Sequence, residues 1–254
     1  MLRVNDLVLN YEQAGSNDGP PVVFLHGGLI DSRVWDTQFD WFSERANVIR
    51  LDLPGNGRSQ SPDGSYSGFE TLAAFLSALE VERANLVGLS GGARIAIDFA
   101  IRYPERAEKL VAVAPGLSGY ERWLLPKELV PPFLAALEAG DRDAAAEAWL
   151  DIWAPATKGR LLDFGRDNAA SLFIQDTLEE LEPPAIGRLG ELTAPTLVIV
   201  GDRDLQDIQT IVDLISKDAP LAQKTIFPGA DHFPNVHDPS AFNAAVAAFL
   251  DLPA

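Results

Sequence analysis

The chain contains no cysteine among its 254 residues. It can therefore form no disulfide framework and carry out no thiol chemistry, and we expect it in a reducing, cytoplasmic setting. Long apolar runs are also missing, and none approaches the roughly 20 residues that a membrane-spanning helix needs. Residues Met1 to Asp6 lack a basic region followed by a long apolar core, so they predict no secretory signal.

Basic residues are scarce: 20 Lys and Arg stand against 37 Asp and Glu, which gives a formal net charge of -17. A field of this sign repels polyphosphate and anionic lipid, so we expect neither nucleic acid nor a membrane as a partner. The hydrophobic content of 47% is enough to fill one large core. These numbers favour a single domain that carries an insertion.

Compact apolar runs alternate along the chain with segments of helical spacing, which predicts an α/β fold with a mainly parallel sheet flanked by helices. Two short strands are expected within residues 2–12. The buried strands are expected at Pro21–Leu25, Val48–Leu51, Asn85–Leu89, Leu110–Ala114, Pro195–Val200 and Lys224–Phe227. The helices between and after them are expected at Val34–Arg45, Glu70–Leu79, Ala93–Tyr103 and Pro239–Leu250.

The strand pattern disappears between Gly116 and Gly190. Helical segments follow one another there, at Lys127–Ala139, Arg142–Ile152 and Leu161–Glu182, and the last can be broken in two. The sequence therefore predicts a core formed by residues 1–115 and 191–254, with a helical cap inserted at 116–190.

One short motif carries a chemical signal: the apolar run before Ser90 ends in Gly88-Leu89-Ser90-Gly91-Gly92, and a helical pattern follows. To lift a serine hydroxyl above a sheet, the chain must turn sharply from strand to helix, and only small residues two before and two after leave room. The Gly91 amide, at the start of that helix, would point to where an oxyanion forms. Ser90 is thus the candidate nucleophile.

Two other polar residues follow predicted strands. Asp204 lies in the sequence Gly-Asp-Arg-Asp after one strand, and His232 lies in Gly-Ala-Asp-His after the last. The chain therefore presents a serine, an aspartate and a histidine in the order that α/β-hydrolases use. Asp202 and Asp207 share the loop of Asp204 and remain alternatives for the acid, as His26 and His237 do for the base.

The chain resembles an α/β-hydrolase with a helical cap, in the branch of small esterases, lactonases and cofactor-free perhydrolases. The resemblance spans nearly the whole chain outside the cap. The residues that carry it are His26-Gly27-Gly28, Asp52 through Ser59, Gly88 through Gly92, Tyr103-Pro104-Glu105-Arg106, Gly201 through Asp204 and Gly229 through Phe233.

The resemblance implies a role for each matching residue. Ser90 would be the nucleophile, His232 the general base, and Asp204, at the fourth position of Gly-x-x-Asp, the acid that orients the histidine. The backbone amides of Gly28 and Gly91 would form the oxyanion hole. No metal and no cofactor is implied.

The cap is expected to choose the substrate. The candidate pocket residues are Trp35, Leu117, Trp123, Trp149, Trp153 and Phe233. Arg94 departs from the family, whose members usually carry a small or apolar residue there. We expect it to pair with a carboxylate such as Asp98 or to face solvent, and a role in anchoring the substrate is the remaining alternative. Asp52 and the glycines after it are interpreted as a rigid structural loop.

The expected activity is that of a serine hydrolase, which cleaves small to medium carboxylic esters or lactones through an acyl-enzyme. Two alternatives remain at this stage. The same triad in a perhydrolase or haloperoxidase-like enzyme would use hydrogen peroxide in place of water. A hydrolase-fold receptor would instead bind a ligand and turn over little.

Overall fold

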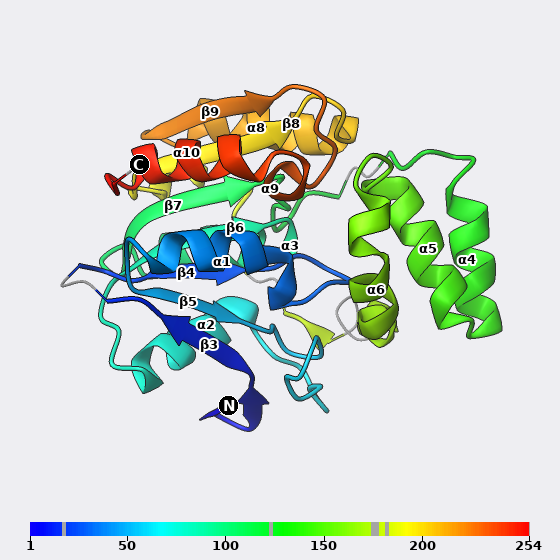
Figure 1. Ribbon diagram of the computed structural model, residues 1–254, viewed down its shortest axis with the longest axis horizontal. Helices are drawn as coiled ribbons and strands as arrows, with labels where there is room; N and C mark the ends of the chain where they lie inside the picture. Colours follow the sequence, from blue (N-terminus) through cyan, green and yellow to red (C-terminus); the bar gives the residue numbers. More distant parts are fainter. Residues whose placement is uncertain (17–18, 122–123, 174–177, 181–182, 254) are drawn as a thin grey trace.

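The computed structural model describes residues 1–16, 19–121, 124–173, 178–180 and 183–253. A central sheet of seven strands forms the middle layer in the described part of the chain (Figure 1). Its order is β3-β5-β4-β6-β7-β8-β9, in which β3 is antiparallel to β5 and all other neighbours are parallel. The strands are β3 (Tyr11–Ala14), β4 (Val22–Leu25), β5 (Val48–Leu51), β6 (Ala84–Leu89), β7 (Ala107–Val113), β8 (Thr196–Gly201) and β9 (Ala222–Phe227).

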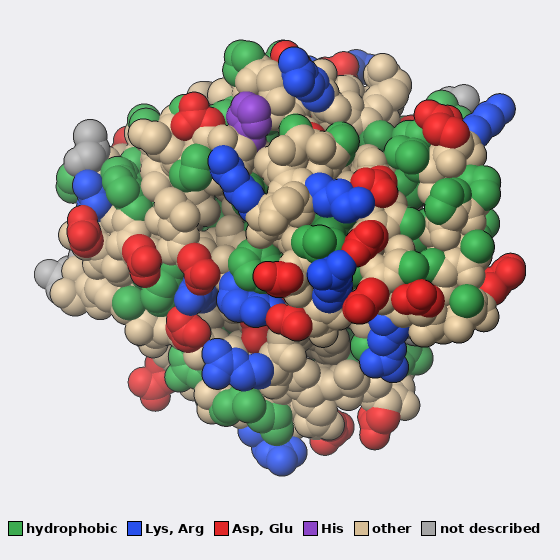
Figure 2. Space-filling view, turned by 45° about the vertical axis from the view of Figure 1, so that its right-hand side comes forward, with side chains coloured by type: hydrophobic (Ala, Val, Ile, Leu, Met, Phe, Trp, Pro, Cys, Tyr) green, Lys and Arg blue, Asp and Glu red, His purple; other side chains and the backbone are tan. Residues whose placement is uncertain are grey.

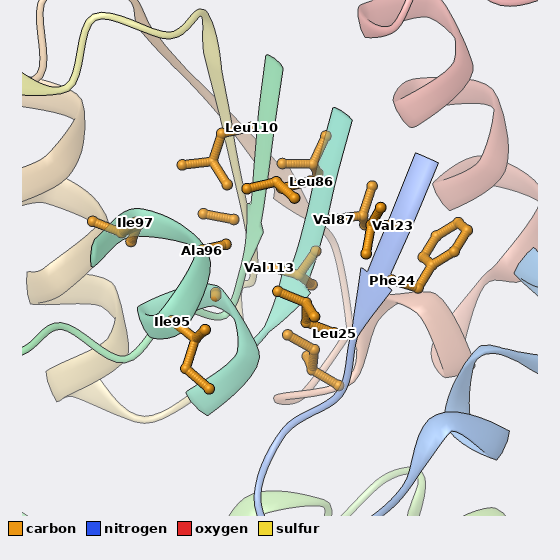
Figure 3. Packing of buried hydrophobic residues seen from close by; sticks show 14 of the residues in the cluster. Val23, Phe24, Leu25, Leu86, Val87, Ile95, Ala96, Ile97, Leu110 and Val113 are labelled. Carbon is orange, nitrogen blue, oxygen red and sulfur yellow. The ribbon is translucent and has the colours of Figure 1, made fainter. Parts of the chain in front are cut away.

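The central strands are apolar because helices cover both faces of the sheet. Every residue of β4, β5, β6 and β8 is buried, as expected for parallel strands between two helical layers. The register pairs Leu25 with Gly88 and Leu89 with Val113, so β4, β6 and β7 end at the same edge of the sheet. Figure 3 shows apolar side chains filling the space between these strands and the helix that follows β6.

The flanking helices come from the segments between the strands. Helices α1 and α10 contact each other on one face of the sheet, and α2 and α3 contact each other on the opposite face (Figure 1). Helix α8 packs against β8 and β9. Their bounds are α1 (Asp36–Ser43), α2 (Gly68–Ala78), α3 (Gly91–Arg102), α8 (Gln206–Asp218), α9 (Pro234–His237) and α10 (Pro239–Phe249), and the turn η1 (Ser32–Trp35) precedes α1.

The segment 116–190 is called the cap segment, and three helices in its described part lie beyond the edge where the parallel strands end, at the right of Figure 1. These are α4 (Val130–Ala139), α5 (Arg142–Trp153) and α6 (Lys158–Asn168), and the turn η2 (Ala169–Phe173) follows. Further along, Tyr66 and Glu179 form a parallel bridge, in which the Tyr66 amide donates to Leu178 (3.0 Å) and the Glu180 amide donates to Tyr66 (2.8 Å). This bridge holds the end of the cap segment against the core.

The structure corrects three expectations. The third cap helix begins at Lys158 and ends at Asn168, where the chain tightens into η2, instead of running over 161–182; residues 174–177 and 181–182 lie outside the described residues. The two short strands expected within residues 2–12 are present as the antiparallel pair β1 (Leu2–Val4) and β2 (Leu7–Leu9), but the edge strand β3 that follows them was not expected. Helix α8 was not expected. None of the described helices is both long enough and apolar enough to cross a membrane.

Candidate active site

Ser90 lies in the sharp turn between β6 and α3, with φ +53° and ψ −114°, a conformation that costs a non-glycine residue strain. The glycines on either side make the turn feasible. A Cβ added to Gly88 would lie 2.5 Å from the Gly92 carbonyl oxygen, and one added to Gly92 would collide with the His26 carbonyl oxygen. The Ser90 amide donates to Val113 (2.9 Å), which ties the turn to the end of β7.

Asp204 and His232 form a buried pair at the ends of β8 and β9. The imidazole Nδ1 lies 2.9 Å from Asp204 Oδ2 and 3.1 Å from Oδ1, and both side chains are at most 1% exposed. A carboxylate can only accept, so Nδ1 carries the proton and Nε2 is left as an acceptor. Nε2 is buried and has no hydrogen-bond partner among the described residues.

The alternative acids and base have other partners. Asp202 accepts from the Gly229 amide (2.7 Å), and Asp207 accepts from the Tyr120 hydroxyl (2.8 Å). His26 is fully buried, donates from Nδ1 to Gly27 (2.7 Å) and accepts at Nε2 from the Leu53 amide (2.8 Å). Burial lowers the pKa of His26, and these bonds hold it as a neutral structural residue.

Gly28 and Gly91 lie next to each other beside Ser90. A Cβ added to Gly91 would be 3.9 Å from the Gly28 nitrogen, and both glycines line the cavity that Ser90 also lines. Gly91 is the first residue of α3, so its N–H is one of the amides at the helix start that lack an intrahelical acceptor. The two glycine backbones therefore lie side by side at the part of the cavity wall that includes Ser90.

The cavity over Ser90 has a volume of about 580 Å³, which is in the range of small-molecule sites. Its floor comes from the strand ends and α3, and its roof comes from the cap segment. The lining residues are Gly28, Leu29, Ser90, Gly91, Arg94, Gly116, Leu117, Gly119, Tyr120, Leu125, Phe133, Leu137, Trp149, Ile152, Trp153, Ser171 and Glu179.

The sequence profile described as the alpha/beta hydrolase family matches residues 22–245, most of the chain. The chain belongs to this family. A 2-(acetamidomethylene)succinate hydrolase from Mesorhizobium japonicum is 27% identical, with 98% of this chain and 93% of that protein covered. A pimeloyl-[acyl-carrier protein] methyl ester esterase from Nitrosomonas europaea is 25% identical, with 89% and 94% covered.

Among solved structures, the enol-lactonase from Burkholderia xenovorans LB400 superimposes with a TM-score of 0.79 over 98% of both chains, at 24% identity. At that identity the likeness shows the shared α/β-hydrolase fold. The relatives together support a general hydrolase activity and assign neither a bond nor a substrate to this chain.

The candidate pocket residues of this hydrolase fall into three groups. Leu117, Trp149 and Trp153 line the cavity, and Trp123 lies outside the described residues. Trp35 and Phe233 do not line it, which corrects the expectation made from their nearness to motifs. Trp35 is fully buried between Phe24 and Phe242, and Phe233 packs edge-on against the imidazole of His232.

Trp153 links the cavity to the buried histidine. Its ring centroid lies 4.7 Å from that of His232, and its carbonyl oxygen accepts from the His232 amide at 3.4 Å. Trp149 packs against Trp153 at 5.7 Å and extends the aromatic wall along α5. The wall of the cavity and the histidine loop are therefore one packed unit.

Arg94 pairs with a carboxylate, as expected, but the partner is Glu179 instead of Asp98. Its Nη2 lies 2.5 Å from Glu179 Oε2, and the two side chains are 16% and 6% exposed. Burial alone would lower the pKa of Arg94, but the charge of Glu179 and its hydrogen bond outweigh burial, and the pKa lies above its ordinary value. The sequence does not predict Glu179 as a site residue, because the bridge to Tyr66, which is distant in the chain, brings it to the cavity.

Helix α3 carries polar groups at intervals of one turn. Ser90 precedes its first residue, Arg94 lies one turn later, and Asp98 lies one turn after Arg94. Asp98 accepts a hydrogen bond from Ser118 Oγ (2.6 Å), and burial raises its pKa to about 6.

The loop after β5 is a structural part of this hydrolase. Asp52 accepts from the amides of Ser32 (3.0 Å) and Arg58 (2.9 Å) and from Asn10 Nδ2 (2.9 Å). Its carboxylate is thus surrounded by donors and lies outside the cavity lining, in agreement with the interpretation of this loop as a rigid scaffold.

Proposed function

We propose that this α/β-hydrolase cleaves small to medium carboxylic esters or lactones through an acyl-enzyme on Ser90. The observation that carries the proposal is the strained turn at Ser90, which opens beside two backbone amides into a cavity of about 580 Å³. The buried pair of Asp204 and His232 at neighbouring strand ends supports it. The methyl ester esterase among the relatives is consistent with ester chemistry.

In the first half-reaction, Ser90 Oγ attacks the acyl carbonyl carbon, and its proton passes to His232 Nε2. The carbonyl oxygen becomes an oxyanion that accepts from the amides of Gly28 and Gly91, and losing one such donor typically raises the barrier by about 3 kcal/mol. The C–O bond then breaks, and His232 gives its proton to the departing alkoxide. In a lactone this alkoxide remains part of the same molecule.

In the second half-reaction, a water molecule gives a proton to His232 Nε2 as its oxygen attacks the ester of the acyl-enzyme. The tetrahedral intermediate collapses, the carboxylic acid leaves, and Ser90 Oγ takes the proton back from His232. Asp204 keeps Nδ1 protonated throughout and stabilises the imidazolium that forms twice in each cycle.

The proposal is tested with Ser90→Ala. Wild-type protein should be labelled stoichiometrically by a fluorophosphonate and should hydrolyse p-nitrophenyl acetate or butyrate over many turnovers, and the variant should lose both properties. Ser216→Ala is the matched control, because Ser216 Oγ bonds to Val212 within α8, away from the cavity lining.

Other outcomes would contradict the proposal in distinguishable ways. Labelling at Ser90 without multiple turnover would favour the ligand-binding receptor. Peroxide-dependent bromination that greatly exceeds ester hydrolysis would favour the perhydrolase. Turnover that survives in Ser90→Ala would exclude Ser90 as the nucleophile.

A further inference from the structure

The described lining of the cavity includes a polar pair, Arg94 and Glu179, and Arg94 is its cationic member. Arg94 follows Ser90 by one helical turn, and its amide donates to the Ser90 carbonyl oxygen at 3.0 Å. Four residues of α-helix advance by about 6 Å, and helical side chains lean back toward the helix start. The guanidinium therefore borders the space that the acyl part of an ester on Ser90 would occupy.

The charge of Arg94 is already balanced by neighbouring acids. Glu179 holds it in a 2.5 Å ion pair, and Asp98 lies one turn further along the same helix. The remaining titratable group that faces this pair is Tyr66, whose pKa is raised by burial and then by Glu179. Among the described residues around Arg94, the acids therefore match or outnumber the cation.

Glu179 is fixed in its position by the backbone on both sides. The Tyr66 amide donates to Leu178, and the Glu180 amide donates to Tyr66, so the chain around Glu179 is bound like a short strand. The side chain is 6% exposed. A ligand carboxylate would therefore have to share Arg94 with a held carboxylate, and the two negative charges would repel each other.

An uncharged oxygen meets no such repulsion. A carbonyl oxygen can accept a hydrogen bond from a guanidinium that keeps its ion pair, because the group has five N–H donors. The rest of the cavity wall suits carbon chains, since Phe133, Leu137, Trp149 and Ile152 line it.

We propose that Arg94, balanced by Glu179, selects esters or lactones whose acyl part carries an uncharged hydrogen-bond acceptor, such as a keto or amide carbonyl. This selection rests on the proposed serine hydrolase function and gives that function its substrate class.

Three methyl esters of nearly equal size test the selection, with hydrolysis followed by methanol release. Methyl 5-oxohexanoate carries the acceptor, methyl 5-methylhexanoate replaces it with a methyl group, and monomethyl glutarate replaces it with a carboxylate. In wild-type protein kcat/KM should be highest for the keto ester, by about tenfold or more over each of the other two.

Two variants separate the contributions of the pair. Glu179→Gln leaves Arg94 with a neutral partner, so the ratio of kcat/KM for the glutarate ester to that for the keto ester should rise at least about tenfold. In Arg94→Met, kcat/KM for the keto ester should fall to the value for methyl 5-methylhexanoate. Glu147→Gln is the matched control, because Glu147 pairs with Arg166 on the cap surface and its change should leave all ratios unaltered.

The ratios are taken within one preparation, so a partly unfolded variant does not change them. A wild-type preference for the glutarate ester, or ratios in Glu179→Gln equal to those of wild type, would overturn the selection. Failure of the underlying function looks different: p-nitrophenyl acetate would not be hydrolysed and the fluorophosphonate would not label Ser90.

Discussion

At the scale of single residues, Asp98 is a buried acid that forms no ion pair with any described residue. Its side chain accepts from Ser118 Oγ, and that hydroxyl in turn accepts from the Ala185 amide (2.7 Å) of the cap segment. Asp98 is 7% exposed, and its burial raises its pKa from 3.8 to about 6. The native state thus holds a proton there more tightly than the unfolded chain does.

This difference predicts a pH dependence of stability. Between pH 4 and 6 Asp98 is ionised in the unfolded chain but still largely protonated in the native state. Its contribution to the free energy of unfolding therefore falls as pH rises, by up to about 3 kcal/mol in total, and this fall ends once the native state is also ionised, a little above pH 6. Asp98→Asn should remove this contribution and be more stable than wild type at pH 7. Urea unfolding of both proteins from pH 4 to 7 measures it.

The exposed Asp63 provides the control for that experiment, because Asp63→Asn should leave the free energy of unfolding nearly unchanged at each pH. If the free energy of unfolding changes with pH in the same way in wild type and in Asp98→Asn, the pH dependence does not come from Asp98.

At the scale of elements, one carboxylate joins the histidine loop to the cap segment. Asp231, next to His232, accepts from the amides of Ala156 (2.9 Å) and Thr157 (3.0 Å), between α5 and α6, and from the Phe233 amide (3.1 Å). The side chain is 1% exposed. The loop that holds the candidate base and the roof of the cavity are therefore bound through the same group.

Asp231→Ala leaves these buried donors without an acceptor, so we expect a loss of about 2–4 kcal/mol in unfolding free energy and a fall in kcat larger than the change in KM. Thermal unfolding and ester kinetics measure the two effects. Asp238→Ala, which removes only the hydrogen bond to Ala241 at the start of α10, should cost about 1 kcal/mol and leave kcat unchanged. Equal kinetic effects in both variants would contradict a role of Asp231 in holding His232.

The elements that the sequence predicted best are those with a strong local pattern. Strand β5 has the expected bounds because its apolar run lies between polar residues. Helix α8 could also have been found, since Ile208, Ile211, Val212 and Ile215 repeat with helical spacing and all are buried. The edge strand β3 has no such pattern, because it pairs on one side only.

The sequence predicted the parts of the candidate site whose backbone conformation is fixed by a local motif. It did not predict the side-chain positions that depend on packing between distant segments. The turn at Ser90 is dictated by its glycines, whereas nearness in sequence misplaced Trp35, whose side chain points into the core behind the loop. The partner of Arg94 depends on a bridge between Tyr66 and a segment far away in the chain. No local pattern contains that information.

At the scale of the whole molecule, acidic groups outnumber basic ones and give the net charge of -17. Figure 2 shows red and blue side chains mixed on the face in view, so charges of both signs share the surface. The surplus acids still repel one another, and this repulsion weakens the compact state.

Salt should therefore stabilise the protein. Raising NaCl from 10 to 200 mM shortens the Debye length from about 30 Å to below about 10 Å, which screens the repulsion and should raise Tm by several degrees. Calorimetry at pH 7 measures it, and KCl should give the same increase if screening is the cause. A Tm that falls with salt would mean that surface ion pairs outweigh the net repulsion.

Helix α3 places Arg94 one turn after Ser90, and Asp98 one turn after Arg94. Ser90 and Arg94 thus belong to one rigid element, whereas Glu179, the ion-pair partner of Arg94, belongs to the cap segment. A movement of the cap segment would break this ion pair and leave a buried guanidinium without its partner, so the pair favours the conformation in which the cap segment lies against the core.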